Sequence, residues 1–336
     1  MTQYYRPLAQ IDPVRPANAV SIAGGWAWFT HAEVMFRGGA AEIIPADKVP
    51  GAIRAAISAS RAPVSGLSVE KPRLMGIVNV TPDSFSDGGE FSDRQKAVDH
   101  GLALARAGAD ILDIGGESTR PGAAFVPVEA EIARTEPVIA GLRAQLDTPI
   151  SIDTRKHNVA RAALAAGAGI VNDVSALSFD PQITDLVRNS GVDLCVMHAQ
   201  GDPETMQDNP HYDNVVLDVY DYLNDCVAAA VAAGISREKI IIDPGIGFGK
   251  TVEHNLELLQ NLSLFHGIGC TILLGASRKR FIGTLTGVAD AKQRMPGSVA
   301  VMLAGISQGV QITRVHDIFE SKQALTIWAS ATGMGS

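Results

Sequence analysis

The most constraining feature of the sequence is an alternation of short apolar runs with longer Ala/Leu-rich segments, which begins near residue 73. Short apolar runs bounded by turn residues are typical of buried parallel strands, and the longer segments between them have helical periodicity. The runs are RLMGIVNV (73–80), DILDIGG (110–116), PISIDT (149–154), GIVNDV (169–174), DLCVMH (193–198), KIIIDPG (239–245), TILLGAS (271–277) and QITRVH (311–316).

The clearest helical segments cover residues 92–109, 158–168, 219–235 and 296–309. Several of them end in Ala-Gly or Gly directly before the next strand, as the C-termini of helices commonly do. Eight strand-and-helix repeats in about 260 residues fit a TIM (β/α)8 barrel. A doubly wound sheet would ordinarily have fewer strands and a glycine-rich first turn. The sequence therefore predicts an α/β protein built on a TIM barrel.

Residues 1–70 lie outside this repeat. The stretch IAGGWAWFTHAEVMFRGGAAEIIPA (22–46) indicates short strands joined by Gly-Gly turns, and VPGAIRAAISAS (49–60) indicates a short helix. We expect an appended N-terminal α+β subdomain of unknown role over residues 1–70 and a barrel domain over residues 71–336, with residues 60–72 as the linker. We expect this extension to pack against the barrel and stabilise it rather than to form a second active site.

Composition and charge restrict the partners of the chain. Its 28 Lys and Arg against 36 Asp and Glu give a formal charge of −8, which argues against nucleic acid and anionic membranes as partners. Asp12, Pro13 and Pro16 interrupt the start, where a signal peptide needs an apolar run. The three cysteines form no CxxC pair, which favours a reducing compartment over a disulfide framework or zinc cluster. We expect a cytoplasmic protein.

Polar residues stand at the carboxyl end of every predicted strand. In a TIM barrel these ends face the active-site mouth. One such residue alone would more often be a structural hydrogen-bond partner, whereas a set in register favours a functional site. In chain order the residues are Asn79, Asp113, Asp153, Asn172 with Asp173, His198, Asp243, Ser277 with Lys279, and Arg314 with His316.

Carboxylates and amides come from the first six predicted strands, whereas cationic residues follow the last two. Loops after strands seven and eight form the usual phosphate site of this fold, so SRKR (277–280) and RVH (314–316) predict a site for a phosphate or diphosphate. Asp153 and Asp243 can accept hydrogen bonds from the amidine-like edge of a flat heterocycle, and the Asn172 amide can both donate and accept. A divalent-metal cage is the alternative interpretation of these carboxylates.

Three glycine-rich segments follow predicted strands. TPDSFSDGG (81–89) and GGESTRPGA (115–123) are longer than usual βα connections, and we interpret them as lids that exclude water, with ordinary connections as the alternative. DPGIGFGKT (243–251) is not a P-loop, because Pro244 occupies the position of its first glycine.

Taken in order, the motifs resemble those of the dihydropteroate synthase family. They are MGIVNVTPDSFSDGG, DIGGESTRPGA, IDT, VNDVSA, MHAQGDPETMQ, DPGIGFGK, LLGASRKRFIG and RVHD, between residue 73 and about residue 328. The resemblance implies a pterin-binding catalytic barrel, a transferase that joins 6-hydroxymethyl-7,8-dihydropterin diphosphate to 4-aminobenzoate. The products would be 7,8-dihydropteroate and pyrophosphate, in folate biosynthesis. It further implies Mg²⁺, a homodimer and inhibition by sulfonamides.

The resemblance also implies roles for individual residues, position by position. The pterin would contact Asp153, Asn172, Met197, Asp243, Phe248 and Lys279. The diphosphate would contact Asn79, Arg120, Arg314 and His316, with Asn79 also holding Mg²⁺. The 4-aminobenzoate would contact Phe85, Thr119, Pro121 and Ser277. The catalytic residues would be Asp87, Lys279, Arg314 and His316.

Two other functions remain possible from the sequence, because sites rather than folds carry function. A methyltetrahydrofolate-binding methyltransferase on the same barrel would share the pterin-edge Asp and Asn residues but lack the STRPG, SRK and RVH motifs, which are present here. A non-catalytic pterin-binding protein would be expected to have lost some of six residues, and all of them are retained: Asn79, Thr119, Arg120, Lys279, Arg314 and His316.

Overall fold

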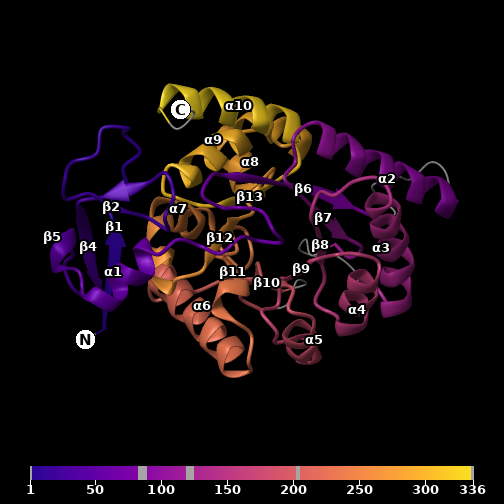
Figure 1. The fold of residues 1–336 in the computed structure, drawn as a ribbon, viewed down its shortest axis with the longest axis horizontal. Helices are drawn as coiled ribbons and strands as arrows, with labels where there is room; N and C mark the ends of the chain where they lie inside the picture. Colours follow the sequence, from indigo (N-terminus) through magenta and orange to yellow (C-terminus); the bar gives the residue numbers. More distant parts are fainter. Residues whose placement is uncertain (1, 82–88, 119–124, 202–204, 334–336) are drawn as a thin grey trace.

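Eight parallel strands close into a barrel in the computed structural model, which describes residues 2–81, 89–118, 125–201 and 205–333 (Figure 1). Each strand pairs with the next along the chain, and β13 pairs with β6 to close the ring. The strands are β6 (Arg73–Asn79), β7 (Ile111–Gly115), β8 (Ile150–Asp153), β9 (Ile170–Asp173), β10 (Asp193–Met197), β11 (Ile240–Asp243), β12 (Thr271–Leu274) and β13 (Ile312–Val315). Each lies within one predicted apolar run, and the predicted TIM barrel is confirmed.

Helices surround this barrel on its outer face (Figure 1). They are α2 (Gly89–Arg106), α3 (Val128–Arg143), α4 (His157–Ala165), α5 (Gln182–Ser190), α6 (Val215–Ala232), α7 (Val252–Gln260), α8 (Arg280–Thr286), α9 (Met295–Ile306) and α10 (Ile318–Ala331). The four predicted helices are α2, α4, α6 and α9, and each ends before its predicted bound. The reason is a glycine with φ between +86° and +110° just beyond each helix, at Gly108, Gly167, Gly234 and Gly309.

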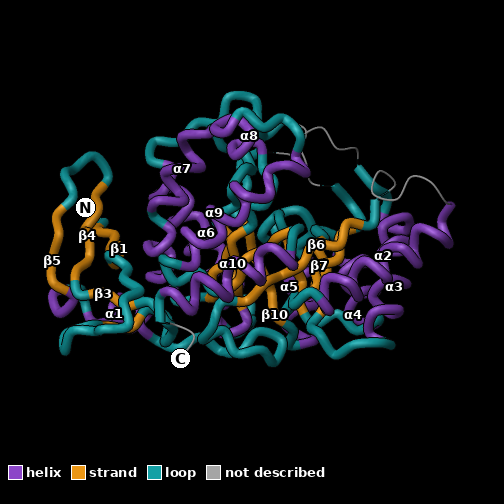
Figure 2. The backbone as a smooth tube through the Cα atoms, turned by 90° about the horizontal axis from the view of Figure 1, so that it is seen from above, coloured by secondary structure: helices purple, strands orange, loops and turns teal. Residues whose placement is uncertain are grey.

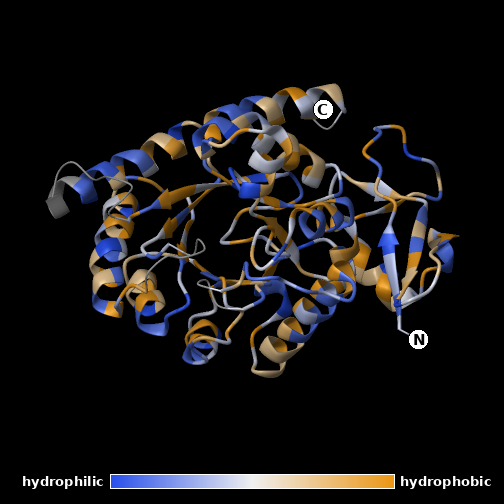
Figure 3. Ribbon diagram, turned by 180° about the vertical axis from the view of Figure 1, so that it is seen from behind, coloured by the Kyte–Doolittle hydropathy of each residue, from blue (hydrophilic) through white to orange (hydrophobic). Residues whose placement is uncertain are grey.

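The apolar core has two parts. One lies between the strands and the helices, and both kinds of element carry hydrophobic residues, which are orange in Figure 3. The other fills the barrel and includes Met75, Cys195 and Ile241 together with Val64 and Val69. Residues 60–72, which we expected to be a linker, therefore contribute two side chains to the barrel interior. Val64 and Val69 are at most 2% exposed, and the Ser65 amide donates to Asp193 Oδ2 at 2.6 Å.

The N-terminal extension consists of small antiparallel sheets and one helix, as predicted, beside the barrel (Figures 1 and 2). Its elements are β1 (Gln3–Pro7), β2 (Val20–Ser21), β3 (Trp28–Phe29), β4 (His31–Phe36), β5 (Glu42–Pro45) and α1 (Gly51–Ser58). The Trp26 indole N–H donates to the Ile306 carbonyl at 2.8 Å, and the Ser263 hydroxyl donates to the Pro7 carbonyl at 2.8 Å. The extension thus docks on α9 and on the 3-10 helix η4 (Leu262–Ile268).

Two observations bear on the environment of the chain. In the parts that the structure describes, no helix combines the length and apolarity needed to cross a membrane. The cysteines are all free thiols, with Cys195 and Cys270 buried and Cys226 half-buried.

Candidate active site

The carboxyl ends of the strands bring several predicted site residues to one rim of the barrel. Register places Asn79 and Asp153 on either side of Gly115, and Asn172 beside Asp153. A Cβ built on Gly115 would lie 3.6 Å from Asp153 Cβ and 3.8 Å from Asn79 Oδ1, so the bare glycine leaves space between those side chains. The predicted convergence of Asn79, Asp153 and Asn172 is therefore present.

Arg314 joins two carboxylates at the centre of this rim. Its Nε donates to Asp113 Oδ2 at 2.5 Å and its Nη2 donates to Asp153 Oδ2 at 2.7 Å. Asn172 Nδ2 also donates to Asp113 Oδ2, at 3.3 Å. The sequence argument gave Asp113 no role, although a carboxylate inside the apolar strand ILDIG requires a buried cation as partner. Asp113 is thus the residue that orients both Arg314 and Asn172.

Burial changes the ionisation of the rim carboxylates. Desolvation raises the pKa of Asp153 to about 7, despite the opposing charge of Arg314. Burial also raises the pKa of Asp243, whereas the Lys279 charge lowers it. Both carboxylates would gain from a ligand that brings N–H donors, because such donors favour the ionised form.

Lys279 follows β12, the neighbour of the strand that ends in Asp243. Its ammonium donates to the Ile246 carbonyl and lies 4.3 Å from the centre of the Phe248 ring. Burial lowers the pKa of Lys279 to about 8, against the raising effect of Asp243. Met197 is the register partner of Asp243, so the apolar and charged groups predicted to hold one heterocycle share this part of the mouth.

His198 differs from the other strand-end residues. Lys250 Nζ lies 2.8 Å from His198 Nδ1 and donates to the Phe248 carbonyl at 2.9 Å. Burial lowers the pKa of His198 to about 2 and lowers the pKa of Lys250 well below its ordinary value. His198 is therefore neutral and supports the loop that carries Phe248. The sequence argument missed Lys250, and its only signal was a lysine directly after a Gly-rich turn.

Ser277 and His316 lie together after the last two strands. The His316 amide donates to Ser277 Oγ at 3.2 Å, and His316 Nδ1 lies 3.0 Å from the same oxygen. This contact joins the loops after β12 and β13. Asp173, by contrast, forms a local turn, accepting from the Ser175 and Leu177 amides at 2.8 and 2.7 Å.

Five predicted site residues lie outside the described part of the chain: Phe85, Asp87, Thr119, Arg120 and Pro121. The described residues on either side of residues 119–124 contact a common partner, Lys156. Lys156 Nζ lies 3.0 Å from Glu117 Oε1 and donates to the Val126 carbonyl at 2.7 Å. Arg155 Nε also donates to Glu117, at 3.2 Å.

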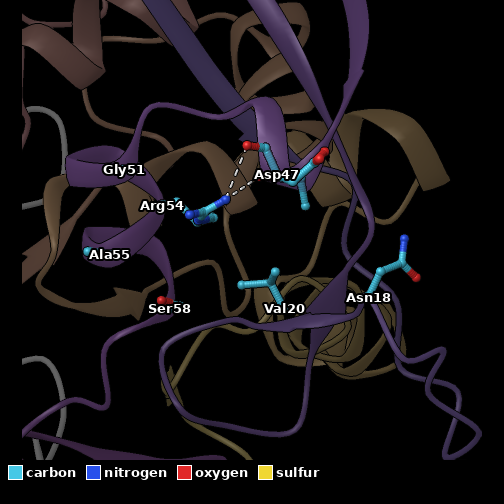
Figure 4. Close-up of a pocket in the computed structure, with 8 residues that line it drawn as sticks. Asn18, Val20, Asp47, Gly51, Arg54, Ala55 and Ser58 are labelled. Atoms are coloured by element: carbon cyan, nitrogen blue, oxygen red, sulfur yellow. Dashed lines mark hydrogen bonds between the residues drawn. The ribbon is translucent and has the colours of Figure 1, made fainter.

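Two cavities are also relevant to the location of the active site. One of about 220 Å³ adjoins Phe248, Arg155 and Tyr222. Another of about 550 Å³ lies in the N-terminal extension between Val20 and α1 (Figure 4). There Arg54 donates to the carbonyls of Ala46 and Asp47, at 3.5 and 3.2 Å. The barrel mouth, with its convergent carboxylates and cations, is the candidate active site.

The metal-cage interpretation of the carboxylates gains no support. Across the described ranges, no group of three or more His, Cys, Asp or Glu side chains could hold a metal ion. Asp113 and Asp153 face the Arg314 guanidinium instead.

The chain was compared with known proteins. A family model described as "Pterin binding enzyme" matches residues 75–316. A dihydropteroate synthase from Neisseria meningitidis serogroup B is 49% identical over 267 residues, which cover 78% of this chain and 93% of the relative. The range that the family model matches includes the carboxyl end of every barrel strand.

Solved structures agree with the sequence relatives. A Xanthomonas albilineans dihydropteroate synthase with 4-aminobenzoic acid has a TM-score of 0.76 at 49% identity, covering 81% of this chain and 97% of its own. The enzyme from that organism in complex with 7,8-dihydropteroate has a TM-score of 0.72 at 47% identity, covering 79% and 95%. A Yersinia pestis dihydropteroate synthase in a sulfonamide drug complex has a TM-score of 0.76 at 40% identity, covering 81% and 99%. Because the family model matches most of the chain and the relatives are matched over nearly their whole length with a similar fold, this chain belongs to the dihydropteroate synthase family of pterin-binding enzymes.

Proposed function

We propose that the chain joins 6-hydroxymethyl-7,8-dihydropterin diphosphate to 4-aminobenzoate, releasing pyrophosphate and forming 7,8-dihydropteroate. The observation that carries this proposal is the set of side chains that converges on the barrel mouth. Asp153, Asn172 and Asp243 supply acceptors and an amide, and Lys279 and Arg314 supply cations beside them. Related enzymes were solved with 4-aminobenzoic acid and with 7,8-dihydropteroate.

The pterin is proposed to bind at the rim carboxylates. A carboxylate can accept two parallel N–H bonds from an amidine-like edge, which suits Asp153 and Asp243. Asn172 would donate and accept on the same edge, and Lys279 would donate to the carbonyl and ring-nitrogen side. Met197 and Phe248 would pack on the ring faces. The Lys279 ammonium over Phe248 favours this arrangement.

The diphosphate is proposed to bind beside the pterin at Asn79, Arg120, Arg314 and His316. An aromatic amine is an unprotonated nucleophile at neutral pH, so a strong base is not required. The chain must instead favour departure of the diphosphate, and positive groups placed before the reaction do this most effectively. Asp87 and the rim carboxylates would stabilise the cationic methylene pterin left behind.

Mg²⁺ fits this site only as an ion that accompanies the diphosphate. Asn79 offers one neutral oxygen near Asp153, and Mg²⁺ takes few protein ligands when phosphate and water supply the rest. When bound, the ion would neutralise charge on the leaving diphosphate. Asn79 is the residue that we propose would hold it.

The 4-aminobenzoate is proposed to bind at Phe85, Thr119, Pro121 and Ser277. Of these, Ser277 lies in the described structure, beside His316. A sulfonamide would compete for this position, as the sulfonamide complex of the Yersinia pestis relative suggests.

We further propose a cytoplasmic homodimer whose catalytic domain spans residues 71–336. Free thiols are consistent with a reducing compartment. On α10, Phe319 and Ile327 are 63% and 67% exposed, which favours burial of that helix face against a second copy. The role of residues 1–70 is proposed to be stabilisation of the barrel.

The test measures pyrophosphate release from purified protein given the pterin diphosphate, 4-aminobenzoate and Mg²⁺. Release should require 4-aminobenzoate, and Lys279→Met should reduce kcat/KM on the order of a hundredfold. Lys292→Met, at an exposed lysine, is the matched control and should keep full activity. Pterin binding without release would instead favour a non-catalytic pterin-binding protein. Transfer of a methyl group would favour the methyltransferase.

A further inference from the structure

We propose that Arg278 is a positioning residue for the diphosphate. Its guanidinium clamps Asp317 and thereby holds Ser277 and His316 in the orientation that receives the leaving group. The inference rests on the proposed function, because it concerns the part of the site assigned there to the diphosphate. It assigns a task to two residues, Arg278 and Asp317, that lie next to the predicted ligands.

The backbone of Arg278 adopts a conformation that a long side chain rarely takes. Its φ is +59°, in the left-handed region that favours glycine. Both of its backbone groups are held: its amide donates to Ser298 Oγ at 2.8 Å, and its carbonyl accepts from Arg294 Nη1 at 3.1 Å. Such strained residues persist where the surroundings fix them, and they cluster at ligand sites.

The side chain of Arg278 makes a two-pronged contact with Asp317. Nε donates to Asp317 Oδ2 at 3.0 Å, and the second nitrogen donates to Oδ1. This forked geometry fixes the angle between the two groups as well as their distance. Asp317 directly follows His316 and directly precedes α10. The clamp therefore acts one residue away from the imidazole.

Two contacts consequently join the loops after β12 and β13: the Ser277 hydroxyl with His316, and the Arg278 guanidinium with Asp317. Both His316 contacts converge on one atom, Ser277 Oγ, so they alone would allow the His316 loop to pivot about that oxygen. The second contact, through a rigid planar group, removes that freedom. Groups fixed before the reaction stabilise developing charge without reorganising.

Lys279, the next residue, is held by other partners. Its ammonium donates to the Ile246 carbonyl and lies over Phe248, both on the loop after β11. Loss of the clamp should therefore disturb the diphosphate side of the mouth and leave the pterin side in place. This separation distinguishes positioning of His316 from a general loosening of the barrel mouth.

The experiment compares binding of 6-hydroxymethylpterin with binding of its diphosphate, to the full-length chain and to Arg278→Lys, Asp317→Asn and the double variant. The unaltered chain should bind the diphosphate more tightly than the plain pterin. In each variant this preference should shrink on the order of tenfold, with kcat falling in parallel and the Kd of the plain pterin unchanged. The double variant should lose no more than either single variant, because both remove one contact.

Arg278→Gly and Arg278→Ala separate the guanidinium from the strained backbone. Both should lose the diphosphate preference equally, whereas the Gly variant should melt at a higher temperature because it tolerates the positive φ. Equal weakening of both pterins would contradict the proposal, as would unchanged binding of both. Tighter diphosphate binding in Asp317→Asn would also overturn it, since a released Arg278 would then be a direct ligand. If the unaltered chain releases no pyrophosphate, the synthase function fails, and the binding comparison still decides the role of the clamp.

Discussion

Asp153 is a carboxylate whose surroundings oppose its ionisation. Burial raises its pKa from the ordinary 3.8 to about 7, although Arg314 favours the charged form. A pKa raised on folding means that the folded chain holds this proton more tightly than the unfolded chain does. Protonated Asp153 therefore makes its full contribution to the stability of the fold below about pH 4, and this contribution is lost as the pH rises through about 7.

The same carboxylate must be ionised to accept two N–H bonds from a pterin edge. We therefore expect the affinity for 6-hydroxymethylpterin to increase as the pH rises from about 5.5 to about 8.5, with a midpoint near the pKa of about 7. Asp153→Asn should weaken binding roughly tenfold or more and remove this step. Calorimetric titration across the pH range measures both effects. A flat profile for the unaltered chain would contradict the assignment.

Arg314 compensates two buried carboxylates at once, so its removal should affect folding as well as chemistry. Arg314→Met leaves Asp113 and Asp153 unpaired and should lower the free energy of unfolding by about 3–5 kcal/mol. Adding Asp113→Asn should restore part of that loss, because one uncompensated charge is removed. Urea unfolding followed by circular dichroism measures the difference. A loss below about 1 kcal/mol in the single variant would show that solvent, rather than Arg314, satisfies these carboxylates.

The sequence predicted which residues reach the mouth but not how they pair. The carboxyl ends of parallel strands meet at one rim of the barrel, so the places of Asp153, Asn172 and Arg314 could be predicted from the ends of the apolar runs. Pairing depends on side-chain packing across the barrel. Asp113 therefore received no role, and His198 received a place at the mouth although Lys250 holds it in the core.

At the scale of elements, the loop after β11 depends on glycine. A Cβ at Gly245, where φ is +68°, would lie 1.8 Å from the His198 carbonyl oxygen. Gly287 has a similar φ of +74° but no described atom within 4 Å of that position. Gly287→Ala should lower the free energy of unfolding by about 1–2 kcal/mol through backbone strain alone.

Gly245→Ala should lower the free energy of unfolding by the same amount and by roughly 1–3 kcal/mol more, because its Cβ would clash with the His198 carbonyl oxygen. It should also weaken pterin binding, because the loop carries Ile246 and Phe248, which position Lys279. Chemical unfolding of the two variants in parallel measures the difference. Equal losses would mean that the loop shifts at no cost, in contradiction to the contact with His198.

Elements with a strong period were predictable, and segments without one were not. Each barrel strand coincides with an apolar run, because both of its faces are buried. Strand β1 was not predicted, since QYYRP has no run of apolar residues and its pairing partner β4 lies far along the chain. Residues 60–72 resembled a linker in composition, and only the closed barrel creates the interior that Val64 and Val69 fill.

At the scale of the whole molecule, the N-terminal extension is attached to the barrel by two kinds of contact. The buried kind includes the Trp26 indole on Ile306 and the Arg61 guanidinium on the carbonyls of Cys270 and His266. The exposed kind is the ion pair of Arg37 with Asp218 and Asp221 on α6, whose Arg37 side chain is 41% exposed. Exposed ion pairs contribute little, so the buried contacts should dominate.

Two variants across this interface test that order. Trp26→Phe removes one of the two donors to the buried Ile306 carbonyl, which still accepts from the Gly309 amide at 3.0 Å. The lost hydrogen bond and the smaller buried ring should together lower the free energy of unfolding by about 1–2 kcal/mol. Arg37→Met should lower the free energy of unfolding by at most about 1 kcal/mol, and this effect should vanish in high salt because exposed charges are screened.

Urea unfolding monitored by both circular dichroism and tryptophan fluorescence measures the two losses. Two of the three tryptophans, Trp26 and Trp28, lie in the extension, whereas Trp328 and most helices belong to the barrel. The two signals should change together, because the buried contacts couple the unfolding of the extension to that of the barrel. A separate early fluorescence transition would mean that the extension unfolds on its own, and its contribution to the stability of the barrel would then be small.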